Sequence, residues 1–278
     1  MVHYSKNEVI IEHIDDFDLT ETFNCGQCFR WNQAIGSTFT GVAYGRVLSI
    51  SKDENRLILS GNNIEKDFER IWRNYFDLNT DYKKIKQKLA KLHPNLAISC
   101  QYAPGIRILQ QEPWETLCSF IISQNNNIPR IKGIIERFCE LFGEEIEPNF
   151  FAFPTCETVA NLSLGDLSQI KCGFRDKYIL DAARKVATGV VNFEIIKNSP
   201  LDEARRELMK IKGVGPKVAE CTLLYGFHRL EAFPIDVWMK RAMETFFPGK
   251  TPSYFGEFAG IAQQYIFHYS RMNPGLFS

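Results

Sequence analysis

A lysine stands at an unusual place in the stretch KGVGPKVAEC, residues 212–221. Lys217 directly follows a Gly-x-Gly-Pro turn and so falls in the first turn of the helix that the turn begins. The N-terminus of a helix carries partial positive charge and disfavours a cation. This position, and burial in a cleft, would both disfavour the charged ammonium form of the side chain. A neutral amine can serve as a nucleophile. A solvated surface lysine is the alternative that the position alone leaves open.

The turn before this lysine has the features of a phosphate site. Gly213 and Gly215 allow a sharp turn and a close approach to a ligand, and Pro216 suits the first turn of a helix. The free backbone N–H groups of the turn and helix start, that of Val218 included, are suited to a DNA phosphate. The pattern is not the GxxxxGK[ST] of a nucleotide-binding loop. A plain turn between two helices is the other interpretation.

An aspartate follows nineteen residues after the lysine, in FPIDVW. As an isolated feature, Asp236 is most simply an N-cap, because an Asp side chain satisfies free helix amides. A carboxylate near an amine nucleophile would also stabilise positive charge developing on a sugar, or relay protons. The lysine and the aspartate together therefore suggest chemistry at a sugar carbon.

The elements that must position these residues fall into two groups. Short β-favouring runs in 38–61, with CFRW at 28–31, predict a small antiparallel sheet, followed by helices at 65–78 and 82–93. Helical patterns dominate after 93–105, the predicted boundary: 112–124, 129–143, 176–189, 202–211, 216–226, 236–247 and 254–270. We therefore predict an α+β protein with a sheet domain at 1–100 and a helical domain at 101–278, with a helix-hairpin-helix at about 203–226.

The amino-acid composition indicates a globular protein but does not identify its binding partner. The 278 residues are 45% hydrophobic, enough for a sizeable core, and lysine plus arginine equals aspartate plus glutamate at 33 each. This balance gives no global basic excess, yet backbone amides can still hold DNA. MVHYSKNEVI has no secretory pattern, so we predict that the eight cysteines are reduced thiols of a cytoplasmic protein. In a bacterium, the protein would be associated with the nucleoid. We expect no membrane span, no metal and no cofactor, since the Cys25-x-x-Cys28 pair has no second pair to complete a zinc site.

In these motifs the chain resembles the helix-hairpin-helix, Gly/Pro–Asp superfamily of base-excision DNA glycosylases, and most closely the 8-oxoguanine DNA glycosylases. GVGPKVAEC and PIDVW match the hairpin and aspartate segments of the family at the family's spacing. The resemblance implies that Lys217 is the nucleophile and Asp236 the catalytic aspartate. It also implies a Schiff-base intermediate and nicking of the strand by β-elimination.

Further stretches imply a lesion pocket. NCGQCFRW resembles the family segment in which the carbonyl of Gly26 accepts the N7–H of 8-oxoguanine, a proton that guanine lacks. FAGIAQQYIFHYS places Gln263 and Phe267 at the family's lesion-pocket glutamine and stacking phenylalanine. Helical spacing is compatible with such a pocket. Lys217 and Cys221 are four residues apart and so share one helix face, and the same holds for Gln263 and Phe267. Without the resemblance, Cys221 and Phe267 would be ordinary core residues.

Two other segments imply contacts with the base left behind. SQNNNIPRI places Asn125 and Arg130 at residues that read the opposite cytosine, whereas the bare pattern indicates only a helix-ending turn. CGFRDKY places Phe174 at the family's wedge and Arg175 at a second cytosine-reading arginine. Trp238 stands where the family has a histidine that helps hold a phosphate. This departure puts that phosphate contact in doubt, although the indole N–H can replace the histidine as a donor.

The partner that the resemblance implies is double-stranded DNA containing 8-oxoguanine, bound by a monomer. Two alternatives stay open: a glycosylase for another damaged base, and a helix-hairpin-helix module that binds DNA without catalysis. The second alternative leaves the spacing of Lys217 and Asp236 unexplained and predicts no covalent intermediate.

Overall fold

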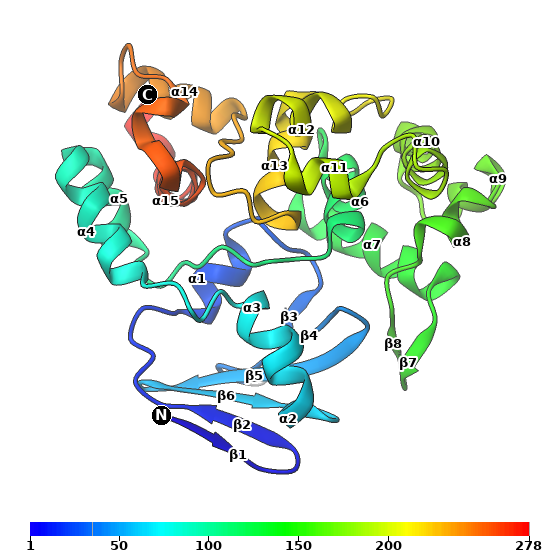
Figure 1. The fold of residues 1–278 in the computed structure, drawn as a ribbon, viewed down its shortest axis with the longest axis horizontal. Coiled ribbons are helices and arrows are strands. Elements are labelled where there is room, and N and C mark those ends of the chain that lie inside the picture. Colours follow the sequence, from blue (N-terminus) through cyan, green and yellow to red (C-terminus); the bar gives the residue numbers. More distant parts are fainter. Residues whose placement is uncertain (35, 278) are drawn as a thin grey trace.

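The computed structural model describes residues 1–34 and 36–277 and shows an α+β chain. Six antiparallel strands form one sheet in the order β1-β2-β6-β5-β4-β3 (Figure 1). Their bounds are β1 (Val2–Tyr4), β2 (Glu8–Ile11), β3 (Trp31–Gln33), β4 (Phe39–Ala43), β5 (Arg46–Asp53) and β6 (Arg56–Ser60). The predicted fold class is confirmed. Strands β1 and β2 were not predicted from the sequence, and the prediction of β structure at 28–31 was wrong for residues 28–30, since β3 begins at Trp31.

Alternation along the strands buries one face of the sheet. Leu48 and Ile50 of β5 and Leu57 and Leu59 of β6 are fully buried, and Ile50 pairs with Leu59 across the two strands. Helix α1 (Leu19–Asn24) and the continuous helical segment α2 (Ile64–Asp67), η1 (Phe68–Trp72) and α3 (Arg73–Tyr75) supply the rest of this core. The predicted helix at 65–78 is therefore present at 64–75, with one π-helical turn in its middle.

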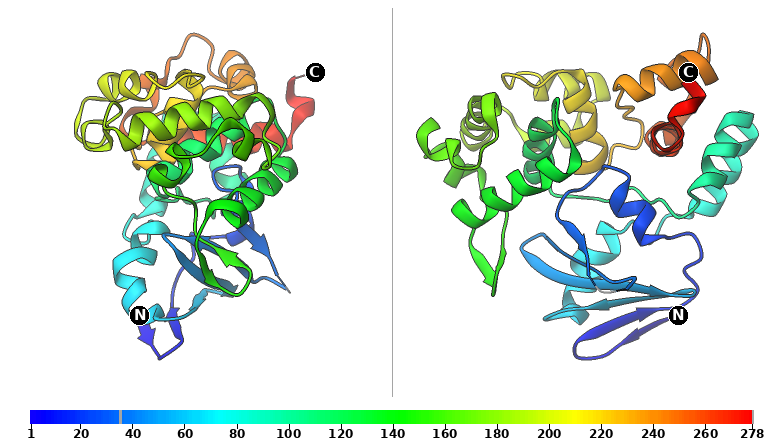
Figure 2. Two further views of the ribbon diagram at one scale, coloured as in Figure 1. Left: turned by 90° about the vertical axis from the view of Figure 1, so that its right-hand side faces the viewer. Right: turned by 180° about the vertical axis from the view of Figure 1, so that it is seen from behind.

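The helical half lies at the opposite end of the molecule from the sheet in all three views (Figures 1 and 2). The predicted helices appear as α4 (Tyr82–Leu92), α6 (Pro113–Ser123), α7 (Ile128–Phe142), α10 (Asp176–Ala187), α12 (Leu201–Leu208), α13 (Pro216–Gly226), α14 (Val237–Phe246) and α15 (Ala259–Met272). Elements not predicted are α5 (Pro94–Tyr102), β7 (Glu145–Glu147), β8 (Phe150–Phe151), α8 (Cys156–Ala160), α9 (Leu164–Ser168), η2 (Gly173–Arg175), α11 (Phe193–Asn198), η3 (Pro252–Phe258) and η4 (Pro274–Phe277).

Two of the predicted segments differ for identifiable reasons. The stretch 254–270 is not one helix, because Gly256, with φ 66° and ψ −146°, interrupts the helical backbone inside η3, and α15 begins only at Ala259. The stretch 93–105, predicted as a connection, contains α5, whose first turn is capped by the ring nitrogen of His93 and begins with Pro94. Helix α5 packs against α15.

The hydrophobic core of the helical half begins at Tyr82 and also takes in Cys25 and Phe29. The segment after α1 therefore belongs to the sheet half in sequence but packs among the helices. This arrangement carries residues 25–29 to the face of α13 and α15. The boundary predicted at residue 100 stays a prediction.

None of the helices within residues 1–34 and 36–277 is long and apolar enough to cross a membrane.

Candidate active site

A small pocket brings together six residues that the sequence singled out. Lys217 and Cys221 come from α13, Asp236 from the segment before α14, Gln263 and Phe267 from α15, and Gly26 from the loop after α1. Phe120, Tyr225 and Pro234 complete the lining. The cavity measures about 40 Å³, room for only a few water molecules, so a base can enter only if its walls move apart.

The half-buried side chain of Lys217 points along the apolar wall of this pocket. Its ammonium lies 4.9 Å from the centroid of the Phe120 ring. Burial raises the pKa of Cys221 to about 11, and the charge of Lys217 opposes that rise. No carboxylate in the described part of the chain lies within 4.0 Å of the Lys217 ammonium. The amine therefore has no counter-ion that a substrate would first have to displace.

Asp236 serves as an N-cap and also lines the pocket. Its Oδ1 accepts a 2.8 Å hydrogen bond from the backbone N–H of Met239, in the first turn of α14. One carboxylate oxygen is thereby fixed, while the side chain as a whole borders the same cavity as Lys217. The two interpretations of this aspartate are compatible, because the capping bond orients the carboxylate without using both oxygens.

The loop that carries Gly26 is held rigidly on both sides. The fully buried side chain of Gln27 donates to the carbonyl oxygens of Thr22 (3.0 Å) and Arg107 (2.8 Å) and accepts from the N–H of Leu109 (2.9 Å). Gly26 has φ +88°, a conformation that favours glycine. The hydrogen bonds found among residues 1–34 and 36–277 include none to its carbonyl oxygen. That oxygen is a fixed, free acceptor.

Gln263 has an unsatisfied polar atom in the same pocket. The residue is 3% exposed, and its Oε1 has no hydrogen-bond partner among the described residues. A buried unpaired acceptor costs about 1–3 kcal/mol. Such an atom is expected where a ligand supplies the missing donor.

The four residues predicted to contact the opposite base also lie together. The turn between α6 and α7 carries Asn125, with φ 47°, and the first turn of α7 carries Arg130; both are exposed. Phe174 in η2 is 49% exposed, and its ring packs edge-on against Tyr178. Arg175 is 2% exposed, and its guanidinium lies 4.5 Å from the centroid of the Phe174 ring. Burial, and then the nearby positive charge of Arg130, lower the pKa of Arg175.

The guanidinium of Arg175 is already occupied. It donates to the carbonyl oxygens of Cys172 (2.9 Å), Gln124 (3.0 Å from Nε) and Asn125 (3.1 Å). In this structure it therefore fixes the turn that presents Asn125. Reading of a base by Arg175 stays a prediction and would require these bonds to break.

The two glycines of the hairpin before Lys217 lie in different surroundings. Gly213 has φ +80°, and a Cβ there would lie 2.5 Å from ring atoms of Tyr178, so the protein itself requires glycine. Gly215 has φ −96° and nothing within 4 Å of its Cβ position. No contact among the described residues therefore requires glycine at this position. Gly215 caps α13 without a side-chain hydrogen bond, which leaves first-turn amides such as that of Val218 available.

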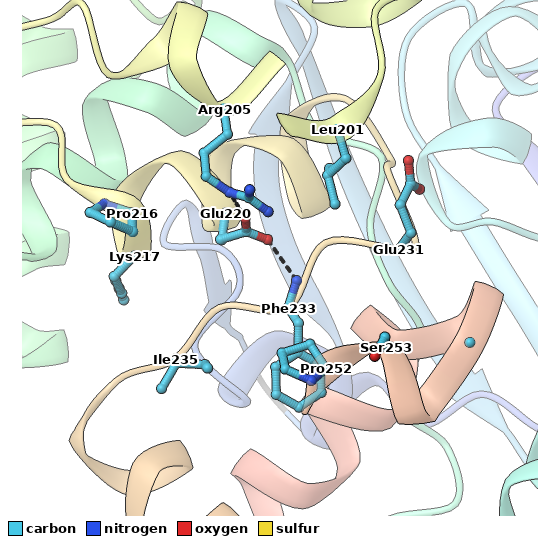
Figure 3. A pocket seen from close by; sticks show the side chains of 11 residues that line it. Leu201, Arg205, Pro216, Lys217, Glu220, Glu231, Phe233, Ile235, Pro252 and Ser253 are labelled. Atoms are coloured by element: carbon cyan, nitrogen blue, oxygen red, sulfur yellow. Dashed lines mark hydrogen bonds and ion pairs between the residues drawn. The ribbon is translucent and has the colours of Figure 1, made fainter. Parts of the chain in front are cut away.

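A larger cavity of about 550 Å³ adjoins the pocket and shares Lys217 with it (Figure 3). At its floor the buried carboxylate of Glu220 binds Arg205 (2.5 Å) and accepts from the N–H of Phe233 (2.7 Å). These bonds attach helix α13 to the segment that leads to Asp236. Glu220 thereby controls the relative position of the lysine and the aspartate.

Several residues of the site were missed from the sequence. Tyr225 lies four residues after Cys221 and eight after Lys217 on the same helix, a spacing that could have identified it. Phe120 and Pro234 come from other segments, and no local pattern marks them. Trp238, which replaces a phosphate-binding histidine of the family, packs against Phe277 and under the guanidinium of Arg241, at 6.2 and 5.6 Å.

The cysteines form no second site. All eight are free and seven are buried. Burial raises the pKa of Cys25 to about 12 and that of Cys28 well above its ordinary value, so both thiols are unreactive. No group of three or more potential metal ligands occurs in the described residues.

The hairpin, its lysine and the aspartate that caps the following helix define a helix-hairpin-helix DNA glycosylase. Residues 118–255 match the family model of HhH-GPD superfamily base excision DNA repair proteins, and residues 9–117 match that of the 8-oxoguanine DNA glycosylase N-terminal domain. The chain belongs to the 8-oxoguanine DNA glycosylase family.

Similar proteins and solved structures support this family assignment. The N-glycosylase/DNA lyase of Saccharomyces cerevisiae is 32% identical over 260 residues, which are 80% of this chain and 66% of the yeast protein. The 8-oxoguanine glycosylase/lyase of Clostridium acetobutylicum, solved with duplex DNA containing cytosine opposite 8-oxoG, is 36% identical with a TM-score of 0.92 over 99% of this chain and 98% of its own. MBOgg1 in complex with a low-affinity DNA ligand is 43% identical with a TM-score of 0.93, over 99% of both chains.

Proposed function

We propose that this chain excises 8-oxoguanine from duplex DNA with Lys217 as nucleophile and then nicks the strand as a lyase. The observation that carries the proposal is that Lys217 and Asp236 line one pocket with Gly26, Gln263 and Phe267. A non-catalytic DNA-binding module has no need for a half-buried amine without a counter-ion at such a place. The names of the relatives, which describe glycosylases with lyase activity, support the same function.

Recognition begins with extrusion of the lesion into the pocket. Unstacking a base costs a few kcal/mol, which an inserted Phe174 and phosphate contacts at the hairpin would offset. The free carbonyl of Gly26 accepts the N7–H of 8-oxoguanine, whereas N7 of guanine is itself an acceptor and would leave two acceptors facing each other. A mismatch of this kind costs roughly 1–3 kcal/mol per unsatisfied group. Gln263 supplies an unpaired acceptor for the donors on the other edge of the base.

The chemistry then follows from the lysine and the aspartate. The neutral amine of Lys217 forms a bond to C1′ while the C1′–N9 bond breaks and its electron pair leaves with the base. The proton lost by the lysine nitrogen neutralises the departing base. Asp236 stabilises the positive charge that develops on the sugar. Opening of the sugar gives a Schiff base, and loss of a C2′ proton expels the 3′-phosphate.

The grip on DNA does not need a global excess of positive charge. Arg130, Lys177, Lys240 and Arg241 are exposed and form no ion pair with any described residue. The ammonium of Lys177 lies 5.5 Å from the centroid of the Tyr178 ring. Many other cations are neutralised on the protein, for example Arg73 by Glu69 and Lys86 by Asp16. The unpaired cations lie on α7, α10 and α14. We further propose that the protein acts as a cytoplasmic monomer, since one chain supplies every residue of the site.

Borohydride trapping tests this function directly. A duplex with one 8-oxoguanine opposite cytosine should give a covalent adduct that is absent with an undamaged duplex and with Lys217→Gln. The variant should still bind the lesion duplex, because the hairpin amides and the lesion pocket remain. Excision by Lys217→Gln at the wild-type rate would overturn the nucleophile assignment. Binding without adduct or released base in the wild-type protein would indicate a DNA-binding module instead.

A further inference from the structure

An arginine that the mechanism does not use lies beside Gly26. Arg271, in the last turn of α15, has its Nη1 3.5 Å from the position that a Cβ on Gly26 would occupy. Among the described residues, the only other side-chain atom within 4 Å of that position is Cε1 of the Phe267 ring, at 3.7 Å. The guanidinium therefore lies on the same side of Gly26 as the ring that lines the lesion pocket.

This guanidinium has no partner in the protein. Within residues 1–34 and 36–277, the side chain of Arg271 makes no hydrogen bond and no ion pair, although the residue is half-buried. Its charge is nevertheless felt nearby: after burial, it lowers the pKa of His268, and it opposes the burial that raises the pKa of Cys25. A partly desolvated cation without a counter-charge is costly unless a ligand provides an acceptor.

The lesion offers such an acceptor at the right place. 8-Oxoguanine differs from guanine at two adjacent atoms, N7, which carries a proton, and C8, which carries a carbonyl oxygen. If the carbonyl of Gly26 accepts the N7–H, as the proposed function states, the C8 oxygen is directed to the immediate neighbourhood of that contact. Gly26 has no side chain to separate this region from Arg271.

We propose that Arg271 donates a hydrogen bond to the C8 oxygen of the extruded base and so makes a second lesion-specific contact. This inference rests on the proposed function. Guanine has C–H at that position, so an extruded guanine would leave the guanidinium unpaired and Gly26 without a donor. Two adjacent contacts of opposite polarity then discriminate the lesion better than one, because a site built around a hydrogen bond strongly rejects an analogue that lacks it.

The experiment compares two reactions of one protein, excision of 8-oxoguanine and nicking at a preformed abasic site, each under single-turnover conditions. Arg271→Leu should slow excision by about tenfold to hundredfold, the loss of one charge-assisted hydrogen bond. It should leave nicking of the abasic duplex within about twofold of wild type, since no base is present to be read. Arg271→Lys should recover part of the excision rate.

A matched control is Arg241→Leu, which removes an unpaired cation on a different helix, α14, from a position that does not lie within 4 Å of the Gly26 Cβ position. As a phosphate contact, Arg241 should affect both reactions equally. If Arg271→Leu also slows both reactions equally while its thermal unfolding matches wild type, Arg271 binds a phosphate and the inference is wrong. Unchanged excision by both Arg271 variants would overturn it as well. Failure of the wild-type protein to excise 8-oxoguanine would instead overturn the proposed function, and the two failures are therefore distinguishable.

Discussion

The side-chain amide of Gln264 donates a 3.1 Å hydrogen bond to the carbonyl oxygen of Cys25, 239 residues earlier in the chain. Its Oε1 accepts from the hydroxyl of Tyr225, which lines the lesion pocket. One buried side chain thus connects α15, α13 and the loop that carries Gly26. This glutamine holds the three elements that enclose the pocket at a fixed separation, whereas the Oε1 of its neighbour Gln263 has no hydrogen-bond partner among the described residues.

Replacing Gln264 with leucine should disturb recognition before chemistry. The change leaves the Cys25 carbonyl and the Tyr225 hydroxyl without their partner, at a cost of about 1–3 kcal/mol in the free energy of unfolding. We expect slower excision of 8-oxoguanine with little change in nicking of an abasic site, measured in parallel with denaturant unfolding. Tyr225→Phe is the control, because it removes only one of the two bonds and should have a smaller effect. Equal loss of both reactions would show that the network supports the catalytic pair and not the base pocket.

Asp236 can be tested with two substitutions that separate its roles. Asp236→Asn keeps an oxygen that can accept from the N–H of Met239 but removes the charge. It should lower the rate of the excision step by about a hundredfold or more while the melting temperature stays near that of wild type. Asp236→Ala should lose the same activity and in addition about 1 kcal/mol of stability, because the N-cap is gone. If the Asp236→Asn variant excised 8-oxoguanine at an undiminished rate, the charge of this residue would have no part in catalysis.

The two hairpin glycines should respond in opposite ways to alanine. Gly213→Ala places a methyl group 2.5 Å from the Tyr178 ring at φ +80° and should destabilise the fold by more than about 1 kcal/mol. Gly215→Ala has open space at φ −96° and should leave thermal unfolding unchanged or slightly raised. It should nevertheless weaken binding to any duplex, damaged or not, because the methyl group projects where a phosphate approaches. Fluorescence anisotropy with an undamaged duplex measures this; undiminished affinity would exclude the hairpin as a phosphate site.

The catalytic candidates of the site were more predictable from the sequence than the side chains that hold them in position. Lys217 and Asp236 stand in local motifs, and the helical spacing of Lys217 with Cys221 places both on one face. By contrast, the bonds from Gln264 to Cys25 and from Glu220 to Phe233 join segments through single side chains, and no local pattern reports them. Strands β1 and β2 were missed for a similar reason, since they are three and four residues long and gain their stability by pairing with each other and with β6.

A half-buried carboxyl at the start of α6, that of Glu112, should make stability depend on pH. Burial, and then the nearby charge of Glu115, raise the pKa of Glu112 to about 7 from its ordinary value of 4.5. The folded state therefore holds this proton more tightly than the unfolded state. The resulting stability is fully present below pH 4.5 and is lost as the pH rises to about 7. Glu112→Gln removes this loss and should raise the free energy of unfolding at about pH 8 by up to about 3 kcal/mol, an upper limit because Glu112 is not fully buried.

At about pH 4.5 the same substitution should have little effect on stability, since the native carboxyl is then already neutral in the fold. Urea unfolding of the wild type and of Glu112→Gln at both pH values measures the difference. Glu157→Gln is a suitable control, because Glu157 is exposed and hydrogen bonds lower its pKa, so this change should not stabilise the protein at the higher pH. A gain for Glu112→Gln of the same size at both pH values would show that packing, and not the cost of a buried charge, is responsible.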